Sequence, residues 1–153
     1  MKKRLYTLMV LPLFLLMFCV ALTHMSYAQQ TKEVILGGYN FEPTVRTSGS
    51  GMVTVRFEND SLTVSGDFSH LTDTYQGAYI MVGEKGESLN MLFRLNATLN
   101  KEKTGGTFDG SENTFALNEA QQKLLKSGEF YITITSQKHT DGELRGQIPP
   151  IKP

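Results

Sequence analysis

The segment that decides the fold is residues 127–148, which reads SGEFYITITSQKHTDGELRGQI. Two alternating runs of apolar and polar residues flank a turn at Asp141-Gly142, a pattern typical of a β-hairpin. Successive side chains of a strand point to opposite faces, so the hairpin should bury one set and expose the other. The inner set is predicted to be Phe130, Ile132, Ile134, Leu144, Gly146 and Ile148, and the outer set Thr133, Thr135, Glu143, Arg145 and Gln147.

The same alternation recurs upstream. Residues 52–58 and 62–68 alternate in this way on either side of a turn at 59–61, which predicts a second hairpin. In the run 78–82, Ala78, Ile80 and Val82 are expected to face inward and Tyr79 and Met81 outward. Many short strands joined by turn residues favour an all-β fold, and we expect an antiparallel β-sandwich of the Greek-key type.

One short helix is predicted over residues 118–127. Asn118 can cap its first turn, Gln121 stands three residues later as in a capping box, and Gly128 follows where a helix would end. A helix of this length does not form stably alone, so it must pack against the sheet.

The first 28 residues have the order of a secretory signal. Lys2, Lys3 and Arg4 precede an apolar run over residues 5–22, and the small residues of Ser26-Tyr27-Ala28 form a cleavage site. We expect residues 1–28 to be removed, leaving a single domain of residues 29–153 in an exported protein, whether secreted, periplasmic or at the cell surface. An uncleaved membrane anchor is the alternative, since the apolar run approaches the length of a membrane span.

The only cysteine, Cys19, lies in this apolar run. A lipid-attachment signal needs a small residue before the cysteine, but Phe18 stands there, so we expect Cys19 to leave with the signal. The domain would then have no thiol and no disulfide, and its core alone must hold it together.

Charge and motifs exclude several classes of function. Without Lys2, Lys3 and Arg4 the remainder has 12 basic and 15 acidic residues, a formal charge of −3. A basic run is missing from it, which disfavours nucleic acid or an anionic membrane as partner. His70 and His139 lie in separate polar connections without a second ligand at metal-binding spacing. We therefore expect no bound cofactor or metal, no catalytic activity and a monomer.

The chain resembles the CHRD domain, a family named for the secreted growth-factor antagonist chordin and common in microbial exported proteins. The most specific piece is the signature Gly142, Glu143, Leu144, Arg145, Gly146 and Gln147, which is similar to the Gly-Glu-Ile-Arg-Gly-Gln ending of the family. Residues 125–131 resemble the family's Leu-x-x-Gly-x-x-Tyr approach to that ending. Upstream, Glu42-Pro43, Thr47, Gly51 and the stretch 105–115 also fit, so the resemblance covers essentially the whole mature chain.

Three positions depart from the family pattern. The resemblance implies a His-x-His where this chain has Tyr79 and Met81, and a further histidine where it has Thr135. These three residues belong to the predicted outer face. Tyr, Met and Thr together are poor ligands for a transition metal, so a metal bound there by the family's histidines should not bind here.

The resemblance implies an extracellular interaction role, as in the animal member. We expect a non-catalytic binding or structural module whose partner is an extracellular or envelope protein.

An exposed Tyr-Met pair beside an arginine is plausible interface chemistry. Arg145 could alternatively lock one sheet edge, because its planar guanidinium fits carboxylates and carbonyls. The other class of function is a metal-binding or superoxide-dismutase-like enzyme, which the three replaced histidines disfavour. The candidate surface is Tyr79, Met81, Thr133, Thr135 and Arg145.

Overall fold

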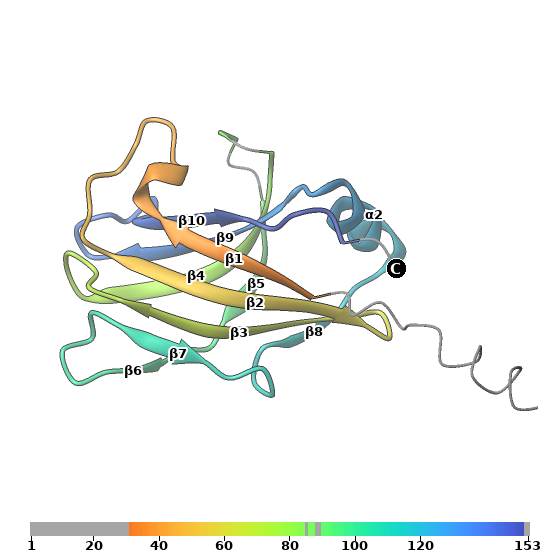
Figure 1. Cartoon of the computed structure of the whole chain (residues 1–153), viewed down its shortest axis with the longest axis horizontal. Helices are drawn as coiled ribbons and strands as arrows, with labels where there is room; N and C mark the ends of the chain where they lie inside the picture. The colour runs from red at the N-terminus through yellow and green to blue at the C-terminus, as the bar shows by residue number, and fades with distance from the viewer. Residues whose placement is uncertain (1–30, 85, 88–89, 152–153) are drawn as a thin grey trace, which may run out of the picture.

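The computed structural model of the chain describes residues 31–84, 86–87 and 90–151. The expected signal peptide over residues 1–28 lies outside them. The described part contains ten antiparallel strands, one short helix and one turn of 3-10 helix (Figure 1). The strands are β1 (Thr31–Gly37), β2 (Ser50–Glu58), β3 (Ser61–Ser69), β4 (Tyr75–Val82), β5 (Met91–Leu95), β6 (Thr98–Leu99), β7 (Gly106–Phe108), β8 (Thr114–Ala116), β9 (Phe130–Ser136) and β10 (Leu144–Gln147), and the helical elements are η1 (Gly38–Asn40) and α2 (Glu119–Ser127).

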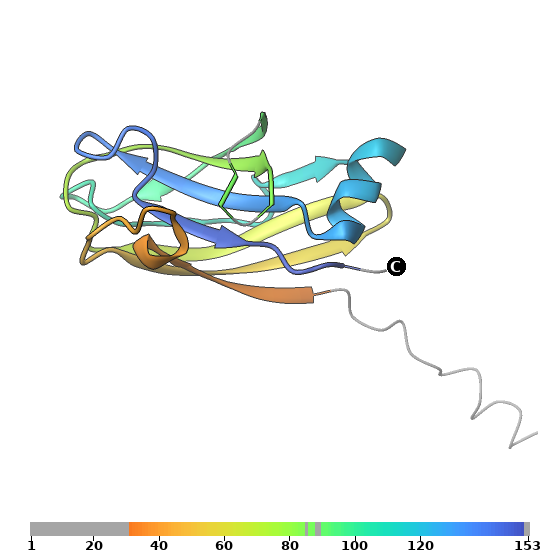
Figure 2. The ribbon, with the colours of Figure 1, turned by 90° about the horizontal axis from the view of Figure 1, so that it is seen from above.

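The strands form one continuous sheet in the order β5-β4-β9-β10-β1-β2-β3-β7-β6, with β8 also paired to β3. The sheet curls strongly into a half-barrel, so β4 and β9 lie across the interior from β2 and β3 (Figure 2). The all-β prediction is confirmed, but the described residues do not show the two separate sheets of a sandwich or a Greek key. An alternating strand buries one face in either architecture, which is why the sequence pattern does not separate them.

Both predicted hairpins are present. In the C-terminal hairpin Leu144 pairs with Ile134 and Gly146 with Ile132, so their side chains share the inner face as predicted. In the other hairpin Phe57 pairs with Leu62 across the turn at Asn59-Asp60. The inner faces meet in one core that also contains Val34, Leu36, Val53, Val55, Val64, Phe68, Ala78, Ile80, Leu95, Phe108, Leu125, Phe130 and Ile148.

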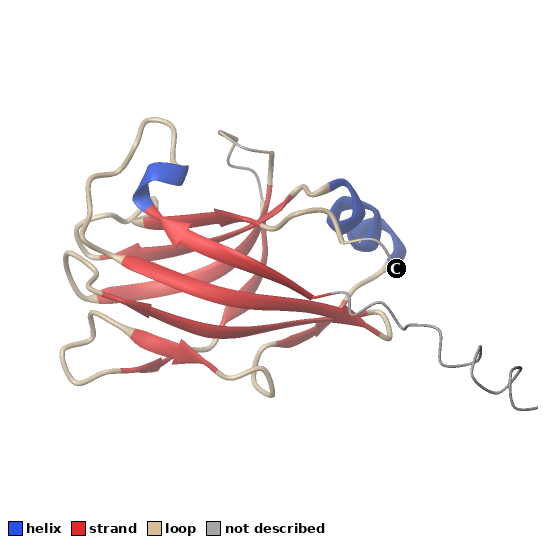
Figure 3. Cartoon of the chain, in the orientation of Figure 1, coloured by secondary structure: helices blue, strands red, loops and turns tan. Residues whose placement is uncertain are grey.

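The predicted helix is confirmed as α2. The Asn118 side chain accepts a hydrogen bond from the backbone N–H of Gln121, and the Gln121 side chain accepts one from the N–H of Asn118. Gly128 ends the helix in the left-handed conformation, and Leu125 is fully buried. The helix and η1 lie toward opposite ends of the sheet (Figure 3). Within residues 31–84, 86–87 and 90–151, neither helical element has the length and apolar character to cross a bilayer.

Candidate functional site: the outer face around Arg145

The predicted candidate surface does share one side of the sheet. Thr133 pairs with Tyr79 on one neighbouring strand and with Arg145 on the other, and residues paired in this way point to the same face. The assignment of faces from the alternation is therefore confirmed for these residues.

The expectation that this face is wet is wrong for most of it. Thr133, Thr135 and Arg145 are buried, with 5%, 7% and 2% of their surface exposed, while Tyr79 and Met81 are only partly buried. Phe41, in the loop that follows η1, lies over the turn at this end of the face, because its ring packs against Gly142, and the Thr133 hydroxyl also lies close to Gly142. Alternation tells which way a side chain points, but not whether a distant loop lies over it. A binding role for Tyr79 and Met81 stays a prediction.

Arg145 makes structural contacts. Its Nη2 donates a hydrogen bond of 2.8 Å to the carbonyl oxygen of Glu84, which ties β10 to the segment after β4. Its Cζ lies 3.6 Å from the centroid of the Tyr131 ring, a cation–π contact. Burial lowers the pKa of Arg145, and the charges of Tyr131 and Glu42 oppose that shift in part. The guanidinium thus anchors the segment after β4 rather than facing solvent.

Glu143, also predicted on the outer face, is completely buried. One carboxylate oxygen accepts hydrogen bonds from Thr47 Oγ1, from the Thr72 hydroxyl at 2.8 Å and from the Thr72 N–H at 2.6 Å. The other accepts a hydrogen bond from Ser136 Oγ. Burial by itself raises the pKa of Glu143, but the donors at Ser136, Thr47 and Thr72 outweigh it and hold the pKa below its usual value. The carboxylate therefore joins two loops to the C-terminal hairpin.

The remaining residues of the Gly142–Gln147 signature have equally definite positions. Gly142 has a φ of 140°, and a Cβ there would lie 2.3 Å from the Phe41 ring. Gly146 faces the side chains of Val34 and Leu36 so closely that a Cβ would lie 2.6 Å from each. Gln147 Nε2 donates to the carbonyls of Gly83, Gly128 and Phe130. Each signature residue thus has a structural reason in this fold.

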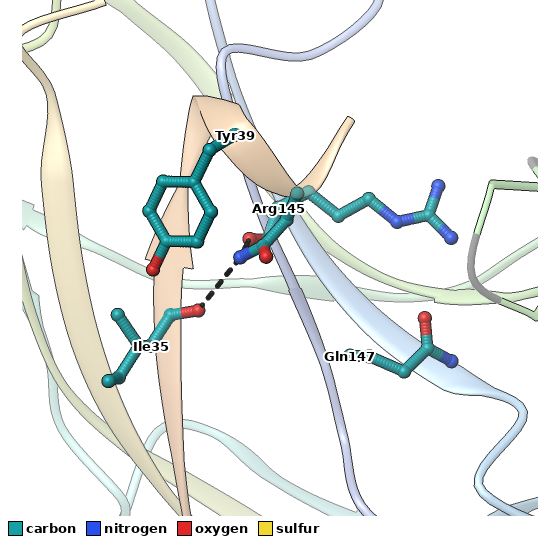
Figure 4. Close-up of a pocket in the computed structure, with 5 residues that line it drawn as sticks. Ile35, Tyr39, Arg145 and Gln147 are labelled. Carbon is teal, nitrogen blue, oxygen red and sulfur yellow. Dashed lines mark hydrogen bonds between the residues drawn. The ribbon is translucent and has the colours of Figure 1, made fainter. Parts of the chain in front are cut away.

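A shallow pocket of about 290 Å³ opens beside Arg145 (Figure 4). Tyr39 and Ile35 stand on one side of it, and Arg145 and Gln147 on the other, with the Arg145 guanidinium directed away from the tyrosine. Asn40, the fifth lining residue, donates from Nδ2 to the carbonyl of Ile35 at 3.2 Å and to that of Arg145 at 2.6 Å. These bonds fix η1 against both β1 and β10.

An exposed apolar cluster borders this pocket. Ile35 is 61% exposed, Tyr39 64% and Met52 52%, and Ile35 and Met52 are paired across β1 and β2. We call these three residues the apolar patch. Sequence reasoning missed it, although a signal existed: in β1 the core residues are Val34 and Leu36, so the same alternation that located the inner faces places Ile35 outside.

The replaced histidine positions and the two histidines of the domain do not form a common site. Among the described residues no three His, Cys, Asp or Glu side chains lie together in a way that could hold a metal ion. At one of the positions where the family histidines are replaced, Thr135 donates from Oγ1 to the carbonyl of Gly77. Of the two histidines after residue 28, His70 is exposed and His139 is partly buried.

Comparison with known proteins links these features to one family. The family model described as the CHRD domain matches residues 29–148, a range that includes all ten strands and the complete Gly142–Gln147 signature. Comparison with curated proteins and with solved structures gave no significant match. The matched range is most of the 153 residues, and the chain therefore belongs to the CHRD domain family.

Proposed function

We propose that this CHRD domain protein is exported and acts as a non-catalytic binding module, and that it contacts its partner through the apolar patch. The observation that carries the proposal is that exposed Ile35 and Tyr39 line a pocket and that exposed Met52 pairs with Ile35 on the next strand. Exposed apolar side chains that gather on one surface favour a protein interface, and Tyr and Met are enriched at the centres of such interfaces.

The patch is built on rigid elements. Ile35 and Met52 lie on strands in the interior of the sheet, β1 between β10 and β2, and β2 between β1 and β3. The Tyr39 ring packs on the backbone of Gly37, where a Cβ would lie 2.3 Å from the ring. A backbone and a ring already held in place lose little conformational entropy on binding, which favours a partner that docks on a preformed surface.

Export is supported by the order of residues 1–28 and by the position of β1. The first strand begins at Thr31, three residues after the expected cleavage site at Ala28, so cleavage there leaves the sheet intact. Mass spectrometry of the exported protein should find Gln29 as its first residue. A retained N-terminal segment would contradict this part of the proposal.

The binding role is tested by partner capture from the native cell envelope. The double variant Ile35→Thr/Met52→Thr keeps a residue that favours β-strands at both positions but makes the patch smaller and polar. We expect it to lose partner capture while its melting temperature stays within a few degrees of the wild type, because the side chains are exposed. Met91→Thr is the matched control, since Met91 is 58% exposed on β5, at the far edge of the sheet. Capture that survives the double variant would overturn the proposal.

A further inference from the structure

Two carboxylates border the apolar patch. Asp67 on β3 pairs with Met52, so the row across the sheet reads Ile35, Met52, Asp67. Glu33 lies two residues before Ile35 on the same face of β1, and both acids are exposed. We call Glu33 and Asp67 the acidic rim.

Lys32, next to Glu33, has the strand parity of the buried Val34 and so starts from the opposite face of β1. Two arginines near this surface are engaged by other groups. The Arg145 guanidinium is buried over Tyr131 and bonded to the carbonyl of Glu84, and it points away from Tyr39 (Figure 4). Arg56, further along β2, forms an ion pair with Glu58 on its own strand. The surface around Ile35 and Met52 is therefore apolar at its centre and negative at its edge.

From this arrangement we propose that the apolar patch binds a cationic segment of another protein, in which apolar side chains alternate with Lys or Arg. The proposal rests on the binding function proposed above and specifies its partner. Apolar side chains of the segment cover Ile35 and Met52 and enter the pocket beside Tyr39. Its basic side chains meet Glu33 and Asp67, because complementary charges at the rim of an interface raise the association rate and select the partner.

A second copy of this chain fits the surface less well. A two-fold contact through the patch would bring two acidic rims together, and the domain carries a formal charge of −3 after loss of residues 1–28. Charge complementarity thus favours a basic partner over self-association.

The test uses three short synthetic peptides of equal length, which alternate Leu with Lys, Leu with Glu, and Ser with Lys. Binding to the purified mature domain is measured by titration calorimetry at low and at high salt. We expect the Leu-Lys peptide to bind more tightly than either of the others, and its affinity to fall as salt is added, because rim charges are screened. Equal binding of the Leu-Lys and Leu-Glu peptides would overturn the inference.

Two variants locate the site. The variant Glu33→Gln/Asp67→Asn should bind the Leu-Lys peptide roughly tenfold more weakly, and its affinity should depend less on salt. Glu102 is an exposed acid in the loop before β7, so Glu102→Gln should change neither the affinity nor its salt dependence. If the rim variant binds the peptide as the wild type does, the inference is wrong. If the variant Ile35→Thr/Met52→Thr still loses envelope capture, the proposed binding function stands and its partner has a different chemistry. If that variant captures its partner as the wild type does, both the proposed function and this inference are wrong.

Discussion

The guanidinium of Arg145 lies over the ring of Tyr131, with 3.6 Å between Cζ and the ring centroid. The two residues are near neighbours on adjacent strands, since Tyr131 pairs with Gln147 and Thr133 with Arg145. A side chain that the sequence places toward water is in this way enclosed between the sheet and the segment at Glu84.

Replacing Arg145 by Lys should destabilise the domain although the charge is kept. A lysine ammonium, which lacks the planar fork of the guanidinium, cannot both contact the Tyr131 ring and donate to the Glu84 carbonyl as Arg145 does, so we expect a loss of about 2 kcal/mol in the free energy of unfolding. Chemical denaturation measures it. Arg56→Lys is the control, because Arg56 is exposed, and it should change stability by less than about 0.5 kcal/mol. An equal effect of both substitutions would show that the ring contact contributes nothing.

The buried carboxylate of Glu143 should make stability depend on pH. Its folded pKa lies below the usual value of 4.5, so its contribution is complete above about pH 4.5 and is lost as the pH falls through the folded pKa. We expect the unfolding free energy to decrease on acidification in this range, and to decrease less steeply in Glu143→Gln. Denaturation curves between pH 7 and the acid limit of folding provide the measurement.

At neutral pH the Glu143→Gln variant should itself be less stable, by about 2 kcal/mol, because an amide nitrogen would face donors such as Ser136 Oγ. Glu102→Gln, in an exposed loop, serves as the control for both experiments. A pH dependence that is the same in all three proteins would contradict the role given to Glu143.

Gly142→Ala tests the turn of the C-terminal hairpin. The φ of 140° is strained for any other residue, and the new methyl group would overlap the Phe41 ring, so we expect a loss of about 2–3 kcal/mol. Gly110→Ala is the control, because the nearest atom to a Cβ there is the end of the Thr63 side chain at 3.0 Å. Thermal unfolding of the two variants should differ clearly, and similar melting temperatures would refute the argument.

Removing the cap of α2 should lower the stability of the domain by a smaller amount. Asn118→Ala removes the acceptor for the Gln121 N–H and should cost about 1 kcal/mol of stability. Asn118→Asp keeps an acceptor at the same place and adds a negative charge at the helix N-terminus, so it should be as stable as the wild type. Chemical denaturation of the pair distinguishes loss of the cap from loss of the side chain.

Alternation in the sequence predicted the hairpins and the inner faces, and the capping residues Asn118, Gln121 and Gly128 predicted the helix, because each of these features depends on residues close together in the chain. Alternation did not predict that Thr133, Thr135 and Arg145 are buried, since burial depends on segments far away in sequence, such as the one at Glu84 that accepts a hydrogen bond from Arg145. It also did not distinguish a sandwich from one curled sheet, which differ in how strands bend and join rather than in which residues face inward. Alternation could have predicted that Ile35 is exposed. It could not show that Ile35 lies beside Met52, because the two residues are paired across different strands.

The position of β1 has a consequence for how the domain is made. This strand emerges first during synthesis, yet one of its two neighbours in the sheet is β10, the last strand. Its hydrogen bonds on that side cannot form until residues 144–147 have left the ribosome, so the sheet is completed only after the last of its strands has been made. A chain cut short before Leu144 would leave both β1 and β9 with an open edge, and such edges invite aggregation.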